Sequence, residues 1–282
     1  MEKENLSKNL SAVIALGALL FWSMNCDIGT PSDPVRDNPL DPGNPEYIPP
    51  ESTILSGPEE GVTIGTAETS FTWTGNQPTS EFSYRLSDAD WSDWSKNTSA
   101  SYTFLDETSY TFEVKSRYPT GQEEVQPEAR NFTVDAVKGP AFTFYKRHSF
   151  PKAGSSFSVD VIAEEVTDLF AASVEVSFNP NLLQVTGITA YGNDGDFLKS
   201  NGGDVVPFFD FDNQIGRVWI DIGVAAGDPV GVTGSGALAN IQFRAIRSGN
   251  SPLRFISDPQ MRDPENNSII INAAADGIVE IE

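Results

Sequence analysis

Short runs in which apolar and polar residues alternate dominate the chain from about Thr53 onward. A period of two is typical of strands that bury one face and expose the other. Between residues 53 and 137 these runs are SFTWTG, FSYRLS, ASYTFL, SYTFEVKSRY and RNFTVDA. Because they recur about every ten residues with polar turns between them, they predict a β-sandwich of about seven strands.

Longer alternating runs fill residues 140–282 and predict a second β-sandwich. In FAASVEVSF, GRVWIDIGV, ALANIQFRA and DVVPFFDFDN, every second residue is apolar and is expected to pack inward. The residues expected to face water are Ala171, Ser173, Glu175, Ser177, Phe208, Asp210, Asp212, Arg217, Trp219, Asp221, Asn240, Gln242 and Arg244. The predicted fold class is therefore all-β, with two successive sandwiches.

The first 25 residues have the pattern of a secretory signal. Lys3 and Lys8 precede the apolar run LSAVIALGALLFW, which is too short for a comfortable membrane span. The single cysteine, Cys26, follows directly, and the junction resembles a bacterial lipoprotein signal in which Cys26 becomes the lipidated first residue. The usual lipobox has Leu, a small residue and then Gly or Ala before Cys, whereas Ser23, Met24 and Asn25 stand here. The alternative is an ordinary signal peptide or an uncleaved anchor, with Cys26 incidental.

Residues 26–52 are crowded with Pro, Asp, Asn and Gly and contain almost no core-forming residues. We expect an extended, partly polyproline-like tether that rises about 3 Å per residue. It would hold the following domains away from a membrane. These features predict an exported lipoprotein, anchored at the bacterial cell envelope or surface.

Composition narrows the function classes. A formal net charge of −22 and a pI near 4.2 disfavour nucleic acid and anionic membrane surfaces as partners, since both would be repelled. One cysteine allows no intrachain disulfide, and the single histidine, His148, leaves few options for metal or nucleophile chemistry. No carboxylate pair is singled out by spacing, so we do not expect an enzyme.

The segment DWSDWS at residues 90–95 contains W-S-x-W-S, which resembles the signature of class I cytokine receptors. In those receptors the motif follows the tyrosine-bearing penultimate strand, whereas Trp91 and Trp94 precede it here. The order instead resembles bacterial surface repeats in which the motif closes a hairpin. If residues 91–94 form a strand, the two rings face opposite sides, so we expect one Trp to cover the core and no shared platform. A ligand-binding role for the pair is the alternative.

The run FLDETSYTFEVKSRYPTGQ resembles the penultimate strand of immunoglobulin and fibronectin type III domains. The resemblance implies that Leu105 begins a corner, that Tyr110 is the tyrosine-corner residue and that Val114 points into the core. Residues 53–137 are therefore expected to form a spacer domain of this kind.

Residues 140–282 resemble the cohesin family, the receptor modules of cellulosomes, through four segments in order. Gly154 with the run SFSVDVIAE matches the opening strand, and SVEVSFNPNLLQV matches a later strand, with Phe178–Asn179–Pro180 in the place of Tyr-Asp-Pro. GSGALANIQFRA and NNSIIINAAADGIVEIE match the closing strands. The resemblance implies a nine-strand jelly-roll sandwich that binds another protein, recruits polysaccharide-degrading enzymes and is not catalytic.

In cellulosomal cohesins one flat sheet binds the dockerin module of an enzyme. The resemblance implies the following partner-binding residues: Ser173, Glu175, Asp210, Trp219, Asn240 and Arg244. Trp219 is expected to contribute most, because a solvent-facing Trp on an open sheet is typical of a binding hot spot. The alternative is that the segment AAGDPVGVTGSG covers it. The Asn and Asp with which many cellulosomal cohesins contact dockerin fall on Ala171 and Ser173, which argues against a standard cellulosomal dockerin.

Carbohydrate binding is the alternative function, because the jelly-roll is shared with carbohydrate-binding modules. It would require aligned aromatic rings, for which Trp219, Phe208 and Tyr191 are the candidates. A structural stalk without a ligand is a third class. The loops YGNDGDF and DFDNQIG offer oxygen ligands for a structural Ca²⁺, but neither has a full calcium-loop pattern. No other cofactor is expected.

Overall fold

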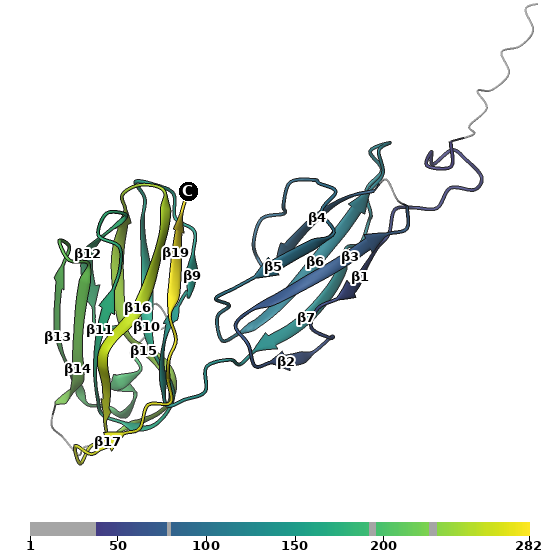
Figure 1. Cartoon of the computed structure of the whole chain (residues 1–282). Helices are drawn as coiled ribbons and strands as arrows, with labels where there is room; N and C mark the ends of the chain where they lie inside the picture. The colour runs from purple at the N-terminus through teal and green to yellow at the C-terminus, as the bar shows by residue number, and fades with distance from the viewer. Residues whose placement is uncertain (1–37, 78–79, 192–195, 226–229) are drawn as a thin grey trace, which may run out of the picture. The chain divides into compact units, whose positions relative to one another are not determined.

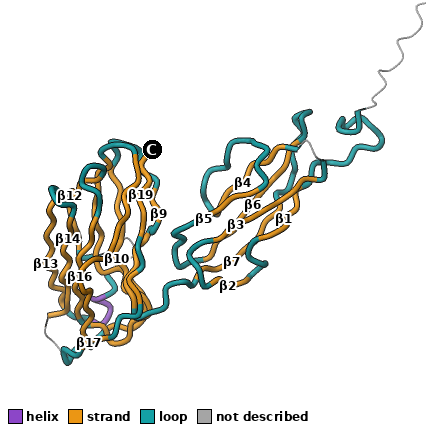
Figure 2. The backbone as a smooth tube through the Cα atoms, viewed as in Figure 1, coloured by secondary structure: helices purple, strands orange, loops and turns teal. Residues whose placement is uncertain are grey.

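The structure, a computed structural model, describes residues 38–77, 80–191, 196–225 and 230–282. Within these ranges the regular structure is β-strand, apart from one short 3₁₀ helix, η1 (Leu198–Asn201), as Figures 1 and 2 show. The prediction of an all-β chain with two successive sandwiches is confirmed.

The first sandwich consists of a three-stranded sheet in the order β1-β3-β5 and a four-stranded sheet in the order β2-β7-β6-β4. Its strands are β1 (Ser52–Ser56), β2 (Val62–Ile64), β3 (Thr69–Gly75), β4 (Glu81–Leu86), β5 (Ser99–Tyr102), β6 (Ser109–Arg117) and β7 (Glu128–Val134). Trp73 and Phe112 are buried at its centre, and the ring of Phe71 stacks on that of Phe112 with centroids 4.0 Å apart. The two sheets therefore share one aromatic core.

The second sandwich packs a sheet in the order β12-β15-β10-β8-β18 against a larger one in the order β13-β14-β11-β16-β19-β9, with β17 paired to β16. Its long strands are β8 (Ala141–Tyr145), β10 (Ser156–Leu169), β11 (Ala171–Ser177), β12 (Leu183–Thr189), β13 (Asp204–Asp212), β14 (Arg217–Ala225), β15 (Val232–Ala245), β16 (Gly249–Arg262) and β19 (Gly277–Ile281). Two-residue strands complete it: β9 (His148–Ser149), β17 (Ser268–Ile269) and β18 (Ala273–Ala274).

The inward residues of the second sandwich follow the predicted alternation. Val174 and Val176 on β11, and Val218, Ile220 and Ile222 on β14, are all buried in its core. On the edge strand β13 the alternation is weaker, because Phe211 remains 38% exposed. An edge strand has a neighbour on one side only, which explains the incomplete cover.

Tyr110 forms the predicted corner. Its hydroxyl accepts a hydrogen bond from the backbone N–H of Asp106, at 2.8 Å, and Leu105 and Val114 are buried. Burial raises the pKa of the Tyr110 hydroxyl, so this group stays protonated. The corner thereby connects the chain before β6 to the sheet.

Trp91 and Trp94 lie on the same side of the first sandwich, contrary to the prediction of opposite faces. The Arg85 guanidinium lies 4.7 Å from the Trp91 ring, the Lys115 ammonium lies 5.0 Å from both rings, and the Arg117 guanidinium lies 4.5 Å from the Trp94 ring. The order Arg–Trp–Lys–Trp–Arg defines a cation–π ladder. The expectation failed because residues 91–94 are not a strand.

The serines of W-S-x-W-S attach the ladder segment to β4. The Ser92 backbone donates to the Tyr84 carbonyl at 2.9 Å, and the Ser92 hydroxyl accepts from the Tyr84 N–H at 3.1 Å. Ser95 and Phe82 exchange backbone hydrogen bonds of 3.0 and 2.7 Å. The motif is therefore an edge cover of the sheet, with each residue type in a distinct role.

Residues 38–47 form successive turns instead of the extended tether expected there. Asn38, Asp41 and Asn44 each precede a proline, and each side-chain oxygen accepts from the backbone N–H two residues on, at 2.8–3.0 Å. Each of their carbonyls accepts from the N–H three residues on. Asx–Pro dipeptides favour such turns, and their repetition every three residues shortens this part of the chain. Residues 1–37, with Cys26 and the signal-like segment, lie outside the described residues.

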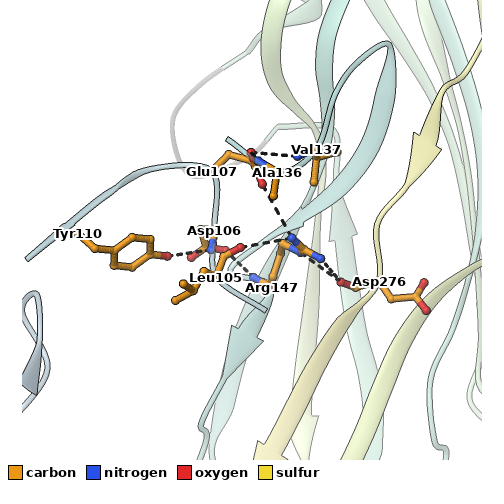
Figure 3. Close-up of polar contacts among 8 residues, drawn as sticks. All are labelled: Leu105, Asp106, Glu107, Tyr110, Ala136, Val137, Arg147 and Asp276. Atoms are coloured by element: carbon orange, nitrogen blue, oxygen red, sulfur yellow. Dashed lines mark hydrogen bonds and ion pairs between the residues drawn. The ribbon is translucent and has the colours of Figure 1, made fainter. Parts of the chain in front are cut away.

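Arg147 connects the two sandwiches, as Figure 3 shows. Its backbone N–H donates to the Asp106 carboxylate at 2.7 Å, and its guanidinium donates to the carbonyls of Leu105 and Asp276 and lies 3.9 Å from the Glu107 carboxylate. The residue is only 7% exposed, and burial lowers its pKa. A buried guanidinium requires such partners, because an unpaired charge away from water is costly.

Candidate functional site

Four of the predicted contact residues lie on one face of the larger sheet of the second sandwich. Ser173 and Glu175 are on β11, Asp210 is on β13 and Trp219 is on β14. In the antiparallel register Trp219 pairs with both Glu175 and Asp210. Paired residues share a face, so these side chains form a row across the sheet, which Figure 1 shows as neighbouring strands. We call the outward surface of β13, β14, β11 and β16 the β11 face.

Trp219 lies at the middle of the β11 face and is partly exposed. Residues 226–229 of the segment that we expected as an alternative cover lie outside the described residues. The two carboxylates beside the ring, on Glu175 and Asp210, make one row acidic on both sides of an aromatic ring.

Polar contacts on the β11 face hold its side chains in place. The Glu175 carboxylate accepts a hydrogen bond from Ser257 and lies 3.7 Å from the Arg217 guanidinium. Phe208 on β13 stands diagonal to Trp219 and is 68% exposed, because this edge strand has a neighbouring strand on one side only. An exposed aromatic ring beside fixed charges is typical of a surface that binds a partner.

Asn240 and Arg244 do not belong to the β11 face, which corrects the prediction. Both are on β15, in the opposite sheet of the sandwich. Asn240 is 6% exposed, and its amide donates to the buried Asp160 carboxylate at 2.5 Å. Alternation gave the direction of Asn240 correctly but gave no information on what lies over it. Arg244 is exposed, but on the far side of the core.

Strand β16 completes the β11 face and was not identified from the sequence. It pairs with β11 and brings Gln260 opposite Ser173 and Arg262 opposite Ala171. Its alternation is interrupted by Pro252 and Pro259 and by a register shift near Ser257, whose φ is +63°. Prolines and a bulge normally argue against a central strand in a sequence. Leu253 and Met261 are nevertheless apolar and buried, as in a strand with one face on the core.

Within the described residues, the other chemistry considered from the sequence is not assembled at the β11 face; residues 192–195 of the YGNDGDF loop lie outside them. In the DFDNQIG loop, the Asp212 carboxylate accepts a hydrogen bond from the Gln214 backbone N–H at 2.7 Å. The Asn213 side-chain oxygen accepts one from the Val185 backbone N–H at 2.8 Å. His148 contacts the Thr103 carbonyl at 3.2 Å and packs on Phe150. Among the described residues no cluster of three or more His, Cys, Asp or Glu side chains could hold a metal ion. Within the same ranges no helix is long and apolar enough to cross a membrane.

The fold and the β11 face define a class, a two-sandwich β protein with an open and partly aromatic sheet surface. No protein-family model matches the chain, and no curated protein does. Solved structures that resemble it include cohesin domains. A non-cellulosomal cohesin from the archaeon Archaeoglobus fulgidus is 17% identical, with a TM-score of 0.38 over 48% of this chain and 86% of that one.

Two further cohesins come from complexes with dockerins. The third cohesin of ScaC from Acetivibrio cellulolyticus, solved with the ScaB dockerin, is 20% identical, with a TM-score of 0.41 over 50% of this chain and 97% of that one. The cohesin of the Coh-OlpA–Doc918 complex from Clostridium thermocellum is 16% identical, with a TM-score of 0.40 over 48% of this chain and 94% of that one.

Proposed function

We propose that the chain is a non-catalytic binding protein anchored at the cell surface, whose second sandwich docks a dockerin-like module of a partner protein. The observation that carries the proposal is the row Asp210–Trp219–Glu175, placed across three neighbouring strands of an open sheet face. The cohesin-like sequence segments of residues 140–282 support the same class of partner. Polysaccharide-degrading enzymes that carry such a module are the partners we propose.

The chemistry of the β11 face suits a protein partner. A partly exposed Trp already loses part of its contact with water, and a partner that covers the remainder gains apolar burial without ordering a flexible chain. The adjacent carboxylates favour basic groups at the rim and would speed encounter with a positively charged module. Glu175 is held by Ser257 and Arg217, so the face is preorganised on this side.

Docking can be tested with the full chain and a Trp219→Ala variant as matched baits, exposed to secreted proteins of the source organism with calcium. A dockerin-bearing protein found by mass spectrometry is then purified and titrated. We expect a Kd of about 1 μM or below, weakened about 30-fold by Trp219→Ala. Gln242→Ala, an exposed residue on the opposite sheet, is the control and should bind normally. Equal affinity of wild type and Trp219→Ala for every partner would remove the proposal.

Anchoring is proposed through Cys26, followed by the Pro-rich segment to residue 52. A single acyl chain gives only marginal membrane binding, so we expect a multiply acylated cysteine. Mass spectrometry of the mature amino terminus should find acylated Cys26, and Cys26→Ser should release the protein from membranes. A free Cys26, or cleavage at another position, would contradict this part of the proposal.

Carbohydrate binding stays the alternative function because Phe208 and Trp219 are diagonal neighbours on one face. Diagonal residues on paired strands lie about 7–8 Å apart, within reach of neighbouring rings. Affinity electrophoresis in gels that contain cellulose, xylan or chitin tests this class. Retardation that Phe208→Ala and Trp219→Ala both abolish would favour it over protein docking.

A further inference from the structure

The β11 face is hollowed at one end. A depression of about 350 Å³ lies over the central strands β14 and β11. The outward residues there are small: Gly223 on β14 pairs with Ala171 on β11, and Ser173 follows two residues on. A side chain at Gly223 would meet the Ala171 Cβ at 3.1 Å, so the floor lies close to the backbone.

Longer side chains on the outer strands form two walls. On β13, Val206 and Phe208 are 37% and 68% exposed. On β16, Gln260 and Arg262 line the other side. Small residues between bulky ones give a socket whose lining is largely apolar, and such a socket gains most from one bulky apolar side chain of a partner.

The floor is where the departure from the cellulosomal pattern falls. Ala171 and Ser173 stand at the positions of the Asn and Asp with which many cellulosomal cohesins contact dockerin. Neither a methyl group nor a hydroxyl reproduces the hydrogen bonds of that pair.

Opposite charges lie on the two sides of the depression. Asp221 on β14 is exposed, beside Ser173 in the register. Arg262 on β16 donates to three neutral oxygens, those of Gln260, Ser268 and Asn266. β14 and β16 are two strand spacings apart, about 10 Å, which is also about the diameter of an α-helix with its side chains. One helix above β11 can therefore reach both charges.

We infer that the partner lays one α-helix over β11, seats a Leu, Met or Phe side chain in the depression, and directs Lys or Arg toward Asp221 and Asp or Glu toward Arg262. The inference rests on the proposed docking function and names the chemistry of the partner. It replaces hydrogen bonding at positions 171 and 173 by an apolar contact.

The probe is a set of Ala-rich helical peptides of about 18 residues with one central guest residue. Successive residues of a helix are about 100° apart around its axis. Lys residues placed three positions after and four positions before the guest therefore lie on one flank of the peptide. Glu residues placed three positions before and four positions after the guest lie on the other flank. A reporter with para-fluorophenylalanine as guest is followed by fluorine NMR while Phe, Leu, Ser and Ala guests compete for the full chain. Phe and Leu should bind about tenfold more tightly than Ser and Ala.

Two variants on the same strand and face separate the depression from the rest. Ser173→Leu fills the depression and should reduce the advantage of the Phe guest to less than about twofold. Ser177→Leu, four residues along β11 and outside the depression, should leave it unchanged. Phe208→Ala removes one wall from an exposed position and should weaken the Phe guest as well. Circular dichroism checks that each variant is folded.

The charge arrangement is tested by exchange. A peptide with Lys and Glu flanks interchanged should bind wild type several-fold more weakly, and the double variant Asp221→Lys, Arg262→Glu should reverse that preference. No binding of the Phe guest at millimolar concentration, equal binding of Phe and Ser guests, or an unchanged response in Ser173→Leu would overturn the inference.

The outcomes for the two proposals are separable, because Trp219 does not line the depression. A natural partner that depends on Trp219 but is unaffected by Ser173→Leu leaves docking in place and removes the helix-and-socket inference. Peptides that seat in the depression, with no partner dependent on Trp219, would do the opposite.

Discussion

The Tyr110 hydroxyl shows how much one residue decides in the first sandwich. It accepts a hydrogen bond from the backbone N–H of Asp106, and the carboxylate of the same residue accepts one from the Arg147 N–H at 2.7 Å. The position of Tyr110 could be predicted, because the interval from Leu105 to β6 is a local pattern. The burial of Asn240 could not, since alternation specifies which side of a sheet a residue faces and says nothing about how far that side is covered.

Replacement of Tyr110 by Phe should destabilise the first sandwich by about 1 kcal/mol, because the partly buried Asp106 N–H loses its acceptor. Urea unfolding followed by circular dichroism measures the change. Tyr84→Phe is the control, since the ring of Tyr84 packs 4.9 Å from Trp73 and the phenyl group retains that contact. Equal stability of Tyr110→Phe and wild type would show that the corner hydrogen bond contributes nothing net.

At the scale of elements, the cation–π ladder and β16 mark the limits of strand patterns. A strand with a period of two would place the two rings of DWSDWS on opposite sides, but residues 91–94 are not a strand, and both rings lie over the cations of β4 and β6. Each cation is also paired with a carboxylate: Arg85 with Glu113, Lys115 with Glu123 and Arg117 with Glu81. The ladder depends on residues up to about thirty positions apart, so no local window could reveal it. β16 was missed for a similar reason, because its partner β11 overrides the prolines.

Trp94→Ala should cost about 2 kcal/mol, since Trp94 stacks on both Lys115 and Arg117 and each such contact contributes about 0.5–1 kcal/mol beyond the lost burial. Equilibrium unfolding in urea gives the free energy. Lys96→Ala, an exposed neighbour in the same segment, should change stability by less than about 0.5 kcal/mol. A cost for Trp94→Ala as small as that of the control would mean that the cation–π ladder contributes nothing measurable to the free energy of unfolding.

The acidity of the whole molecule acts through partly buried carboxyl groups as well as through those on the surface. Burial raises the pKa of Asp106, Glu164 and Asp276, and the carboxylates of Glu107, Glu165 and Asp135 add to the effect at Glu164. With a net charge of −22, the field of the protein also disfavours further negative charge. Composition predicted the sign of that field, but only the fold selects which carboxyl groups are buried in it.

Glu164→Gln should therefore stabilise the protein at neutral pH. Because the pKa of Glu164 is raised above its ordinary value of 4.5, the folded state binds its proton more tightly than the unfolded state. The resulting stability is complete below about pH 4.5 and is lost as pH rises through the folded-state pKa. Glutamine carries no charge and can still accept from Ser235, whose hydroxyl lies 2.5 Å from Glu164. We expect a melting temperature about 2 °C above wild type at pH 7.5 and no difference at pH 4. Scanning calorimetry across this range makes the comparison.

Glu60→Gln is the opposing control. The Asn131 hydrogen bonds lower the pKa of Glu60, so any loss of stability should appear at neutral pH and disappear at acid pH. If the melting temperatures of Glu164→Gln and wild type differ by the same amount at every pH, this carboxyl titrates alike in the folded and unfolded chains.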